Sequence, residues 1–315
     1  MSNCDKFWTS YINTTEVCPS TVDSEGYVYT GGWGDNRIIK LDQDGAEVWA
    51  AVPSSEAGGV TAVAVDAAGY VYSTHHGGLV IKLTPEGGDV WSFTGHTDTA
   101  VDVAVDADGD VYSASYDNTV RKIRHNGAEV WSFTGHTDRV VGVAVDADGY
   151  VYSGSRDNTV RKIDRHGNEV WSFLDPAGTV EDVAVDAGGY VYLATGDGAV
   201  RKLTPDGVEV WSFSGHAESS RAVAVDATGY VYSGGNDETV RKITPDGNQV
   251  WSFPGHTSNV MAVAVDPAGY VYTASWDRTA RKLTPDGIEV WSFSGHEAAV
   301  QGVAVDPGLH GAGFW

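Results

Sequence analysis

Short hydrophobic segments alternate with turn sequences along almost the whole chain. In one representative stretch the segments are 143–145, 150–152, 160–163 and 170–173. β-Branched and aromatic residues at every second position are typical of strands. The sequences between them, Asp-Ala-Asp-Gly at 146–149, Ser-Arg-Asp-Asn at 155–158 and Arg-His-Gly-Asn at 165–168, favour tight reversals. The pattern predicts four antiparallel strands, here called a, b, c and d, joined by three turns.

This four-strand unit is repeated from near one end of the chain to the other. The tryptophan of strand d recurs at Trp49, Trp91, Trp131, Trp171, Trp211, Trp251 and Trp291, and the last six are 40 residues apart. A fixed period with almost no insertions indicates one structural unit used many times. A single sheet of this kind cannot bury its own apolar faces, so the units are expected to pack around an axis as blades. We therefore predict an all-β propeller that spans 1–315 as a single domain.

Two sequence features of the unit resemble known propeller repeats. The Gly-His pair at 135–136 and the segment 153–160, Ser-Gly-Ser-Arg-Asp-Asn-Thr-Val, resemble the WD-repeat pattern. The segment 162–171 is similar to the pyrroloquinoline-quinone-type repeat, and that resemblance implies that each strand-d tryptophan docks on the neighbouring blade. The chain departs from the WD pattern at Ile163, where that family has a tryptophan. The hydrogen-bond network of the WD family would therefore lack its last member here.

The strand count leaves two ways of closing the ring. Strand b occurs seven times, but an eighth strand-d sequence lies near the N-terminus at 6–11. In one arrangement this segment joins a strand a at 303–306 and a short strand b at 309–315 to make an incomplete eighth blade. In the other, seven full blades close and one terminal segment is left over. We predict the split eighth blade because it uses every strand-like segment, with 5–11 and 300–315 contributing to ring closure.

Comparison of the repeats separates constant positions from variable ones. The Val-Ala-Val-Asp strand, the glycine of the a–b turn, the Val-Tyr pair, the basic pair of strand c and the tryptophan are nearly constant. Variation is greatest at the residue before the b–c aspartate and in the d–a loops, which emerge on the same face of a meander blade. We expect this variable face to bind a partner, because aromatic and arginine side chains dominate binding hot spots; neutral drift at loop tips is the alternative. The predicted binding residues are His76, Tyr116, Arg139, Arg156, Asn236 and Trp276.

Histidine, serine and aspartate recur together in a way that could suggest a hydrolytic triad. The sets are His96, Ser115 and Asp117, then His136, Ser155 and Asp157, and then His256, Ser275 and Asp277. An enzyme needs one such site, whereas a repeated blade needs the same hydrogen bonds in each copy. The pattern therefore predicts structural networks and no catalytic residue.

No cofactor or metal is predicted. The pair His75 and His76 lacks a third ligand, and the Asp-rich a–b turn at 106–110 lacks the frame of a calcium loop. A quinone-dependent dehydrogenase is the less favoured enzyme hypothesis, because the chain is short for that class and has no adjacent cysteines and no blade with added calcium ligands. Cys4 and Cys18 give no disulfide framework.

The net charge of −23 disfavours nucleic acid and anionic membranes as partners. The excess of aspartate resembles proteins from high-salt sources, in which salt screens the self-repulsion. The N-terminal sequence has no signal-peptide pattern and no segment is apolar for about 18 residues, so neither secretion by a signal peptide nor membrane insertion is expected. A cytoplasmic or virion-associated location fits these features.

The sequence favours a non-catalytic scaffold that binds a protein or a glycan through its variable face. Within that class, a structural or host-attachment component of a virus particle or surface assembly suits the acidic composition. An intracellular WD-type hub for protein complexes is the alternative, and the sequence does not separate the two.

Overall fold

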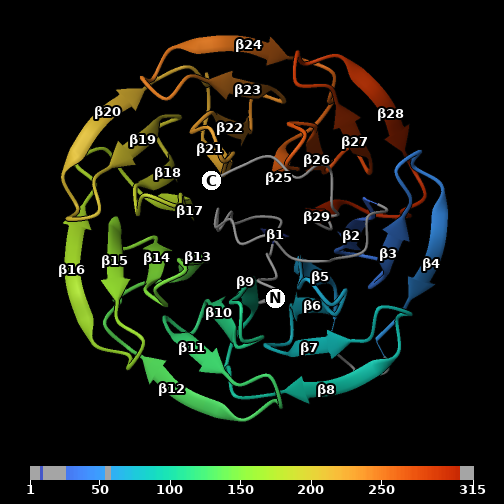
Figure 1. The fold of residues 1–315 in the computed structure, drawn as a ribbon, viewed down its shortest axis with the longest axis horizontal. Helices are drawn as coiled ribbons and strands as arrows, with labels where there is room; N and C mark the ends of the chain where they lie inside the picture. Colours follow the sequence, from blue (N-terminus) through green and yellow to red (C-terminus); the bar gives the residue numbers. More distant parts are fainter. Residues whose placement is uncertain (1–7, 10–25, 54–57, 306–315) are drawn as a thin grey trace, which may run out of the picture.

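The computed structural model describes residues 8–9, 26–53 and 58–305, and within these ranges the chain forms 29 strands and no helix. None of the described segments is therefore a helix that could cross a membrane. The strands form seven antiparallel sheets around a common axis, with each strand d on the outer rim and each strand a at the centre (Figure 1). The predicted β-propeller is confirmed.

The seven blades each contain strands a, b, c and d in spatial order. Blade 1 consists of β29 (Val300–Val305), β2 (Val28–Gly32), β3 (Ile38–Leu41) and β4 (Glu47–Ala51). Blade 2 consists of β5 (Val60–Val65), β6 (Val71–His75), β7 (Val80–Leu83) and β8 (Asp89–Phe93), and blade 3 of β9 (Ala100–Val105), β10 (Val111–Ser115), β11 (Val120–Ile123) and β12 (Glu129–Phe133). Blade 4 consists of β13 (Val140–Val145), β14 (Val151–Ser155), β15 (Thr159–Ile163) and β16 (Glu169–Leu174).

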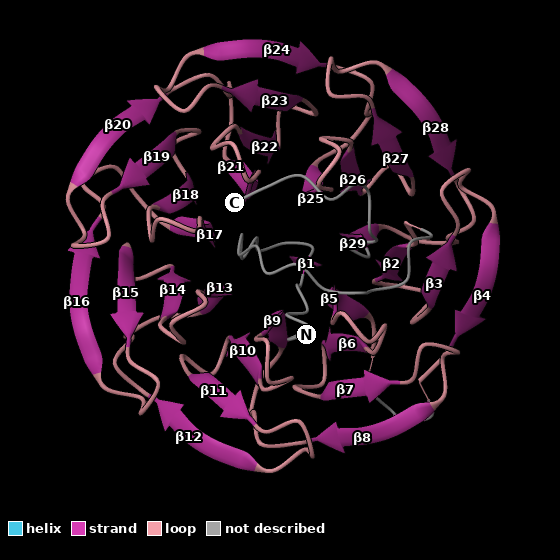
Figure 2. Cartoon of the chain, in the orientation of Figure 1, coloured by secondary structure: helices cyan, strands magenta, loops and turns pink. Residues whose placement is uncertain are grey.

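The remaining blades repeat this plan. Blade 5 consists of β17 (Val180–Val185), β18 (Val191–Thr195), β19 (Val200–Leu203) and β20 (Glu209–Phe213). Blade 6 consists of β21 (Ser220–Val225), β22 (Val231–Gly235), β23 (Val240–Ile243) and β24 (Gln249–Phe253), and blade 7 of β25 (Val260–Val265), β26 (Val271–Ser275), β27 (Ala280–Leu283) and β28 (Glu289–Phe293). Figure 2 shows turns and loops, and no helix, in the described connections between these strands.

The closure of the ring corrects the preferred sequence prediction. The last described strand, β29, pairs with β2 and supplies the inner strand of blade 1, so the ring has seven blades and no split eighth blade. The early segment, β1 (Trp8–Thr9), is not an outer strand: it pairs with β5 as a fifth strand at the inner edge of blade 2. An eighth blade would have lacked a strand c, whereas β29 satisfies the free edge of β2. The predicted strand at 309–315 lies outside the described residues.

The core lies between the blades, and its largest members come from strand b. Seven tyrosines are fully buried: Tyr29, Tyr72, Tyr112, Tyr152, Tyr192, Tyr232 and Tyr272. In blade 4 the ring of Tyr152 packs against Trp171 with a centroid separation of 6.1 Å, and its hydroxyl donates to Asp146 at 2.9 Å. Most of the other blades repeat this arrangement. It explains why the Val-Tyr pair and the strand-a aspartate are constant in the sequence.

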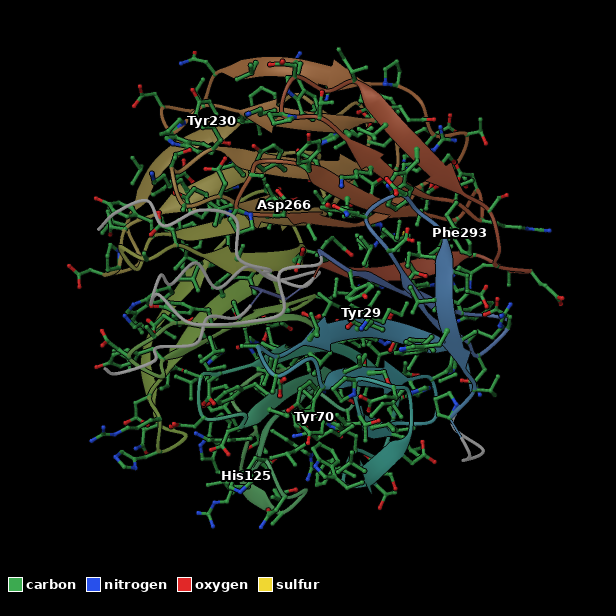
Figure 3. The ribbon with its side chains drawn as sticks, turned by 45° about the vertical axis from the view of Figure 1, so that its right-hand side comes forward. Tyr29, Tyr70, His125, Tyr230, Asp266 and Phe293 are labelled. Atoms are coloured by element: carbon green, nitrogen blue, oxygen red, sulfur yellow. The ribbon has the colours of Figure 1, made fainter. Side chains whose placement is uncertain are left out.

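The strand-d tryptophans join each blade to the next. The indole Nε1 of Trp131 in blade 3 donates to the carbonyl oxygen of Arg165 in blade 4 at 3.1 Å. Its ring covers Gly167, whose φ of +87° and lack of a Cβ permit the close contact. The same bond follows the ring from Trp49 to Pro85, Trp91 to His125, Trp171 to Pro205, Trp211 to Pro245, Trp251 to Pro285 and Trp291 to Gln43. Figure 3 shows the side chains that fill the spaces between the sheets.

Candidate functional site

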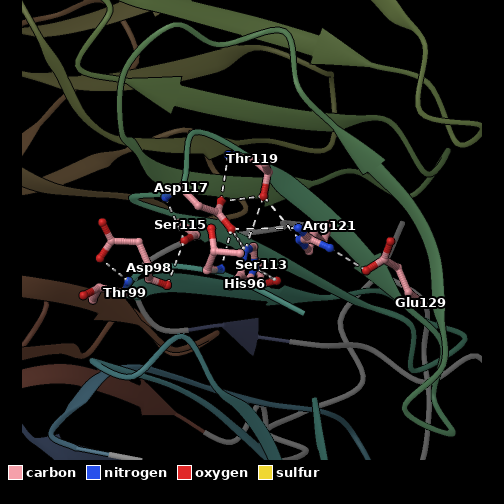
Figure 4. A network of polar contacts seen from close by, with 10 residues as sticks. His96, Asp98, Thr99, Ser113, Ser115, Asp117, Thr119, Arg121 and Glu129 are labelled. Carbon is pink, nitrogen blue, oxygen red and sulfur yellow. Dashed lines mark hydrogen bonds and ion pairs between the residues drawn. The ribbon is translucent and has the colours of Figure 1, made fainter. Parts of the chain in front are cut away.

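The histidines of the d–a loops form repeated networks within the blades. In blade 3, the Nδ1 atom of His96 is 3.0 Å from the carboxylate of Asp117, and Nε2 is 2.8 Å from the hydroxyl of Ser113 (Figure 4). Thr119 donates to the same aspartate at 2.6 Å. Burial raises the pKa of Asp117, but the hydrogen bonds from His96 and Thr119 outweigh it and hold that pKa well below its usual range. The carboxylate is therefore an ionised partner that fixes the loop to the blade.

The serine that contacts each histidine differs from the one singled out in the sequence. In blades 3, 4 and 7, His96, His136 and His256 contact Ser113, Ser153 and Thr273. Ser115, Ser155 and Ser275 lie two residues later, where each accepts a bond from the backbone N–H of Asp117, Asp157 or Asp277 and donates to a d–a loop carbonyl. Among the described residues no histidine bonds these three hydroxyls, and their hydrogen bonds join the b–c turn to the d–a loop.

Blades 2 and 5 replace the network with other groups. In blade 5 the guanidinium of Arg201 donates to the buried carboxylate of Asp175 at 2.6 Å. It also donates to the carboxylate of Asp197 at 2.8 Å. In blade 2, the hydroxyl of Ser73 lies 2.9 Å from Nε2 of His75, and burial lowers the pKa of His75 to about 4. These substitutions preserve a loop anchor by different chemistry, which indicates a structural role at this position.

The variable positions converge at the mouth of the central axis. There the described residues line a cavity of about 240 Å³ that draws on all seven blades. In each blade, the residue just after strand b donates its backbone N–H to the carbonyl oxygen of the residue just before strand a. Examples are Trp33 to Ala299, Tyr116 to Thr99 and Arg156 to Arg139, each at 2.9 Å. The two variable segments thus share one face.

A second ring of variable residues lies inside the first. It is formed by the second residue of each strand a: Thr61, Val101, Val141, Glu181, Arg221, Met261 and Gln301. The register of strand a shifts around this position, as between Val140 and Gly142 in blade 4. The extra residue of such a bulge leaves the ladder and is redirected, and here its side chain lines the cavity. Sequence comparison missed this ring because it stopped at the constant Val-Ala-Val-Asp segment; two further residues upstream would have revealed it.

One side of the face is aromatic. At the outer variable position, the consecutive blades 7, 1, 2 and 3 carry Trp276, Trp33, His76 and Tyr116. The exposed fractions of the Trp276 and Trp33 side chains are 42% and 45%, and the rings of Trp33 and His76 lie 5.9 Å apart. The guanidinium of Arg139 lies 4.4 Å from the centre of the Tyr116 ring. Aromatic side chains therefore occupy the outer variable position in these four consecutive blades.

The opposite side is charged. The carboxylate of Glu181 in blade 5 accepts bonds from Arg221 in blade 6 and from Arg156 in blade 4, the latter at 3.4 Å. Thr179 donates to the other oxygen of Glu181 at 2.8 Å, and Asn236 accepts a bond from Nε of Arg221 at 3.0 Å. The Nε atom of Arg156 is buried and has no partner among the described residues. Two guanidinium groups around one carboxylate leave this side with a net positive charge.

The predicted binding residues are thus divided between the cavity and its surroundings. His76, Tyr116 and Arg156 line the cavity. Asn236 contacts Arg221, Arg139 lies over Tyr116, and Trp276 is exposed on the neighbouring blade 7, so these three lie around the lining. Trp33, Glu181 and Arg221 belong to the cavity and were not among the predicted residues.

Two fully buried acids also lie on strands a. Asp102 of blade 3 accepts a bond from the backbone N–H of Val143 in blade 4, and Asp182 of blade 5 accepts one from Val223 in blade 6, both at 2.8 Å. Burial raises the pKa of each carboxyl well above its usual range, and the charge of Asp102 raises that of Asp182 further. Each carboxyl binds an inner-edge N–H that has no strand partner on that side.

Comparison with known families agrees with this geometry. A family model described as "Outer membrane protein assembly factor BamB", a PQQ-type repeat, matches residues 34–141 and 120–236. The chain belongs to this PQQ-type propeller-repeat family. A model described as "WD domain, G-beta repeat" matches residues 247–282 within this PQQ-type chain, so both resemblances seen in the sequence are confirmed. No curated protein matches the chain.

The PQQ-type repeat is named after a quinone cofactor, so we asked whether the axial cavity could hold a quinone together with calcium. Calcium takes six to eight oxygen ligands, mostly from carboxylates and carbonyls. Among the described residues that line the axial cavity, Glu181 is the one carboxylate, and Thr179, Arg156 and Arg221 already bind its oxygens. No described group of three or more His, Cys, Asp or Glu side chains is arranged to hold a metal ion. The donor set of this cavity does not fit such a group.

Proposed function

We propose that this propeller is a non-catalytic binding scaffold that engages a protein or glycan partner through the d–a and b–c face. The observation that carries the proposal is the contrast between the constant core of the blades and the variable residues at the cavity mouth. Seven blades share the same tyrosines and docking tryptophans, yet the residues that they place around the mouth of the axial cavity range from tryptophan and valine to arginine and glutamate. A constant core beneath a variable, concave face is the arrangement expected of a protein that binds a partner.

The exposed aromatics supply the second argument. Two tryptophans more than 40% exposed on one face are costly, and the other large aromatics among the residues of described burial are buried or half-buried. Tryptophan, tyrosine and arginine are the residues that carry most binding energy at interfaces. Trp33, Trp276 and Tyr116 are therefore the proposed anchors, and Arg139 holds the ring of Tyr116 in place.

The test is partner capture from the native source by immobilised protein. Replacement of Tyr116 and Trp276 by alanine should abolish capture and leave the melting temperature nearly unchanged, because Trp276 is exposed and Tyr116 is half-buried at the cavity mouth, outside the core between the blades. Val170 is 51% exposed on the outer strand β16 and provides the control. Val170→Ala removes apolar surface far from the cavity mouth and should leave capture intact. Capture that survives the double replacement contradicts the proposal.

The setting of this activity stays a prediction. The acidic composition supports a source with high salt, and within such a source a role in a virus particle or surface assembly. A WD-type intracellular hub is the second candidate. The assembly that co-purifies with the native protein at high salt distinguishes the two.

A further inference from the structure

The two sides of the axial cavity together define one kind of ligand. We propose that the cavity recognises a sugar residue that bears a carboxylate, such as a uronic or sialic acid at the end of a glycan. This inference rests on the proposed binding function and specifies its ligand. The sugar ring would stack against the aromatic side at Trp33, and its carboxylate would bind the arginines of blades 4 and 6.

The charge of the cavity favours an anionic group. Arg156 and Arg221 converge on the single carboxylate of Glu181, so the wall that they form carries one net positive charge. The protein as a whole carries −23, which makes a cationic wall at this place unusual. A guanidinium offers five donors in a fixed fork that matches a carboxylate.

The arginine donors are only partly used. Among the described residues, the side chain of Arg156 makes one hydrogen bond, at 3.4 Å to Glu181. The Arg156 side chain is 31% exposed where it lines the cavity, so it can give further charge-assisted hydrogen bonds to a ligand carboxylate. The cavity therefore presents a cationic donor group that is positioned but not satisfied.

The aromatic side favours a sugar over a peptide chain. The rings of Trp33 and His76 are adjacent and tilted by 50°, and Trp33 is 45% exposed, so a broad apolar surface faces the mouth. The apolar face of a pyranose ring packs on such a surface, and the polar tips of the rings remain available for its hydroxyls. The volume of about 240 Å³ suits one sugar residue and its carboxylate.

The surrounding charge also argues against an acidic peptide. The chain carries a net charge of −23, so a peptide with several carboxylates would meet more repulsion than a ligand with one carboxylate. A single carboxylate on a sugar meets the arginines alone. An acidic glycan therefore fits the cavity better than an acidic peptide, and the titration below compares the two.

The experiment is calorimetric titration with three probes of matched length. These are a tetrasaccharide with one terminal glucuronate, the same tetrasaccharide with that carboxylate reduced to an alcohol, and a peptide of four glutamates with blocked ends. The glucuronate probe should bind about tenfold more tightly than the reduced probe, because it adds a charge-assisted bond. Equal binding of the two saccharides overturns the role of the carboxylate, and tighter binding of the peptide overturns the glycan.

Three variants locate the site. Arg156→Gln should weaken binding of the glucuronate probe about tenfold and leave the reduced probe unaffected. Trp33→Ala should weaken both saccharides by about fivefold, since both stack on it. Arg124→Gln removes the same charge from an exposed c–d turn outside the cavity and should change neither affinity. Should Arg156→Gln not fold, Arg221→Gln tests the same wall.

Glu181→Gln gives a prediction of opposite sign. Loss of its charge frees both arginines and removes a like charge, so the glucuronate probe should bind about threefold more tightly. A cavity that recognised a cation would instead lose affinity. If no probe binds while the native partner is still captured, this inference fails and the proposed function stands. If capture is also insensitive to Tyr116 and Trp276, the proposed function fails as well.

Discussion

The indole of Trp291 donates a hydrogen bond to the carbonyl oxygen of Gln43 at 3.0 Å, although the two residues are 248 positions apart in the sequence. It is the same bond that joins every other pair of neighbouring blades. The junction at which the chain closes on itself is therefore built like the six that the chain crosses in order. We therefore expect the tryptophan of each junction to make a similar contribution to the free energy of unfolding.

Removal of one junction tryptophan is expected to destabilise the whole ring. Trp171→Ala deletes the bond to Pro205 and uncovers Gly207, which should lower the free energy of unfolding by about 3 kcal/mol. Urea unfolding followed by circular dichroism measures the change. Ser172→Ala, at an exposed neighbour on the same strand, is the control and should cost under about 0.5 kcal/mol. Equal effects of the two would mean that the junction adds nothing.

Blade 5 offers a comparison between a buried and an exposed ion pair at equivalent arginines. Asp175 is fully buried against Arg201, whereas Glu169 is exposed beside Arg161. Asp175→Ala should cost about 3–5 kcal/mol because Arg201 loses a buried partner. Glu169→Gln should cost less than about 1 kcal/mol, because solvent screens an exposed pair. Thermal and urea unfolding measure both changes, and similar losses would contradict this view of the Arg201 network.

The d–a networks predict a loss of stability in acid. Burial raises the pKa of Asp157, but the bonds from His136 and Thr159 outweigh it, so the folded pKa lies well below the usual value of 3.8. A lowered pKa stabilises the folded state above the unfolded value, and this contribution is lost as the pH falls below about 4. The difference in unfolding free energy between the wild type and Asp157→Asn should therefore shrink from pH 6 to pH 2. A difference that stays constant with pH would exclude an ionised Asp157.

The buried acids of strands a predict the opposite dependence. Burial raises the folded pKa of Asp102 well above its unfolded value, so its contribution to stability is present in acid and is lost as the pH rises. Asp102→Ala, a residue that blades 2, 6 and 7 carry at the same position, should gain stability relative to the wild type between pH 4 and pH 8. Urea unfolding at each pH measures the gain. If the gain is absent, Asp102 is not desolvated.

The repeat made most of the fold predictable from the sequence. Residues that every blade needs, such as Tyr152 and Trp171, recur at fixed spacing, and their recurrence predicts strands, turns and neighbours. The position of Trp8 was mispredicted because its surroundings match strand d locally. Its pairing with β5 is a long-range contact, and no local pattern encodes it. The number of blades followed from β29 and β2, which are also distant in sequence.

The candidate site was only partly predictable for a related reason. Tyr116 and Arg156 stood out because they vary where their neighbours are constant. Glu181 and Arg221 also vary, but they occupy a strand rather than a loop, and the bulge that turns them toward the axis is a feature of register. The contact between Glu181 and both arginines joins blades 4, 5 and 6, so no single repeat contains it.

The pairing of β29 with β2 has a consequence for biosynthesis. Strands β2, β3 and β4 are translated before strands a to d of the other six blades, but the inner edge of their sheet receives its partner β29 only after those blades have been translated. Throughout that interval the backbone donors of β2 are open to other nascent chains, a condition that promotes aggregation. Substitutions that weaken β29 should therefore reduce the yield of assembled protein more than its stability once made.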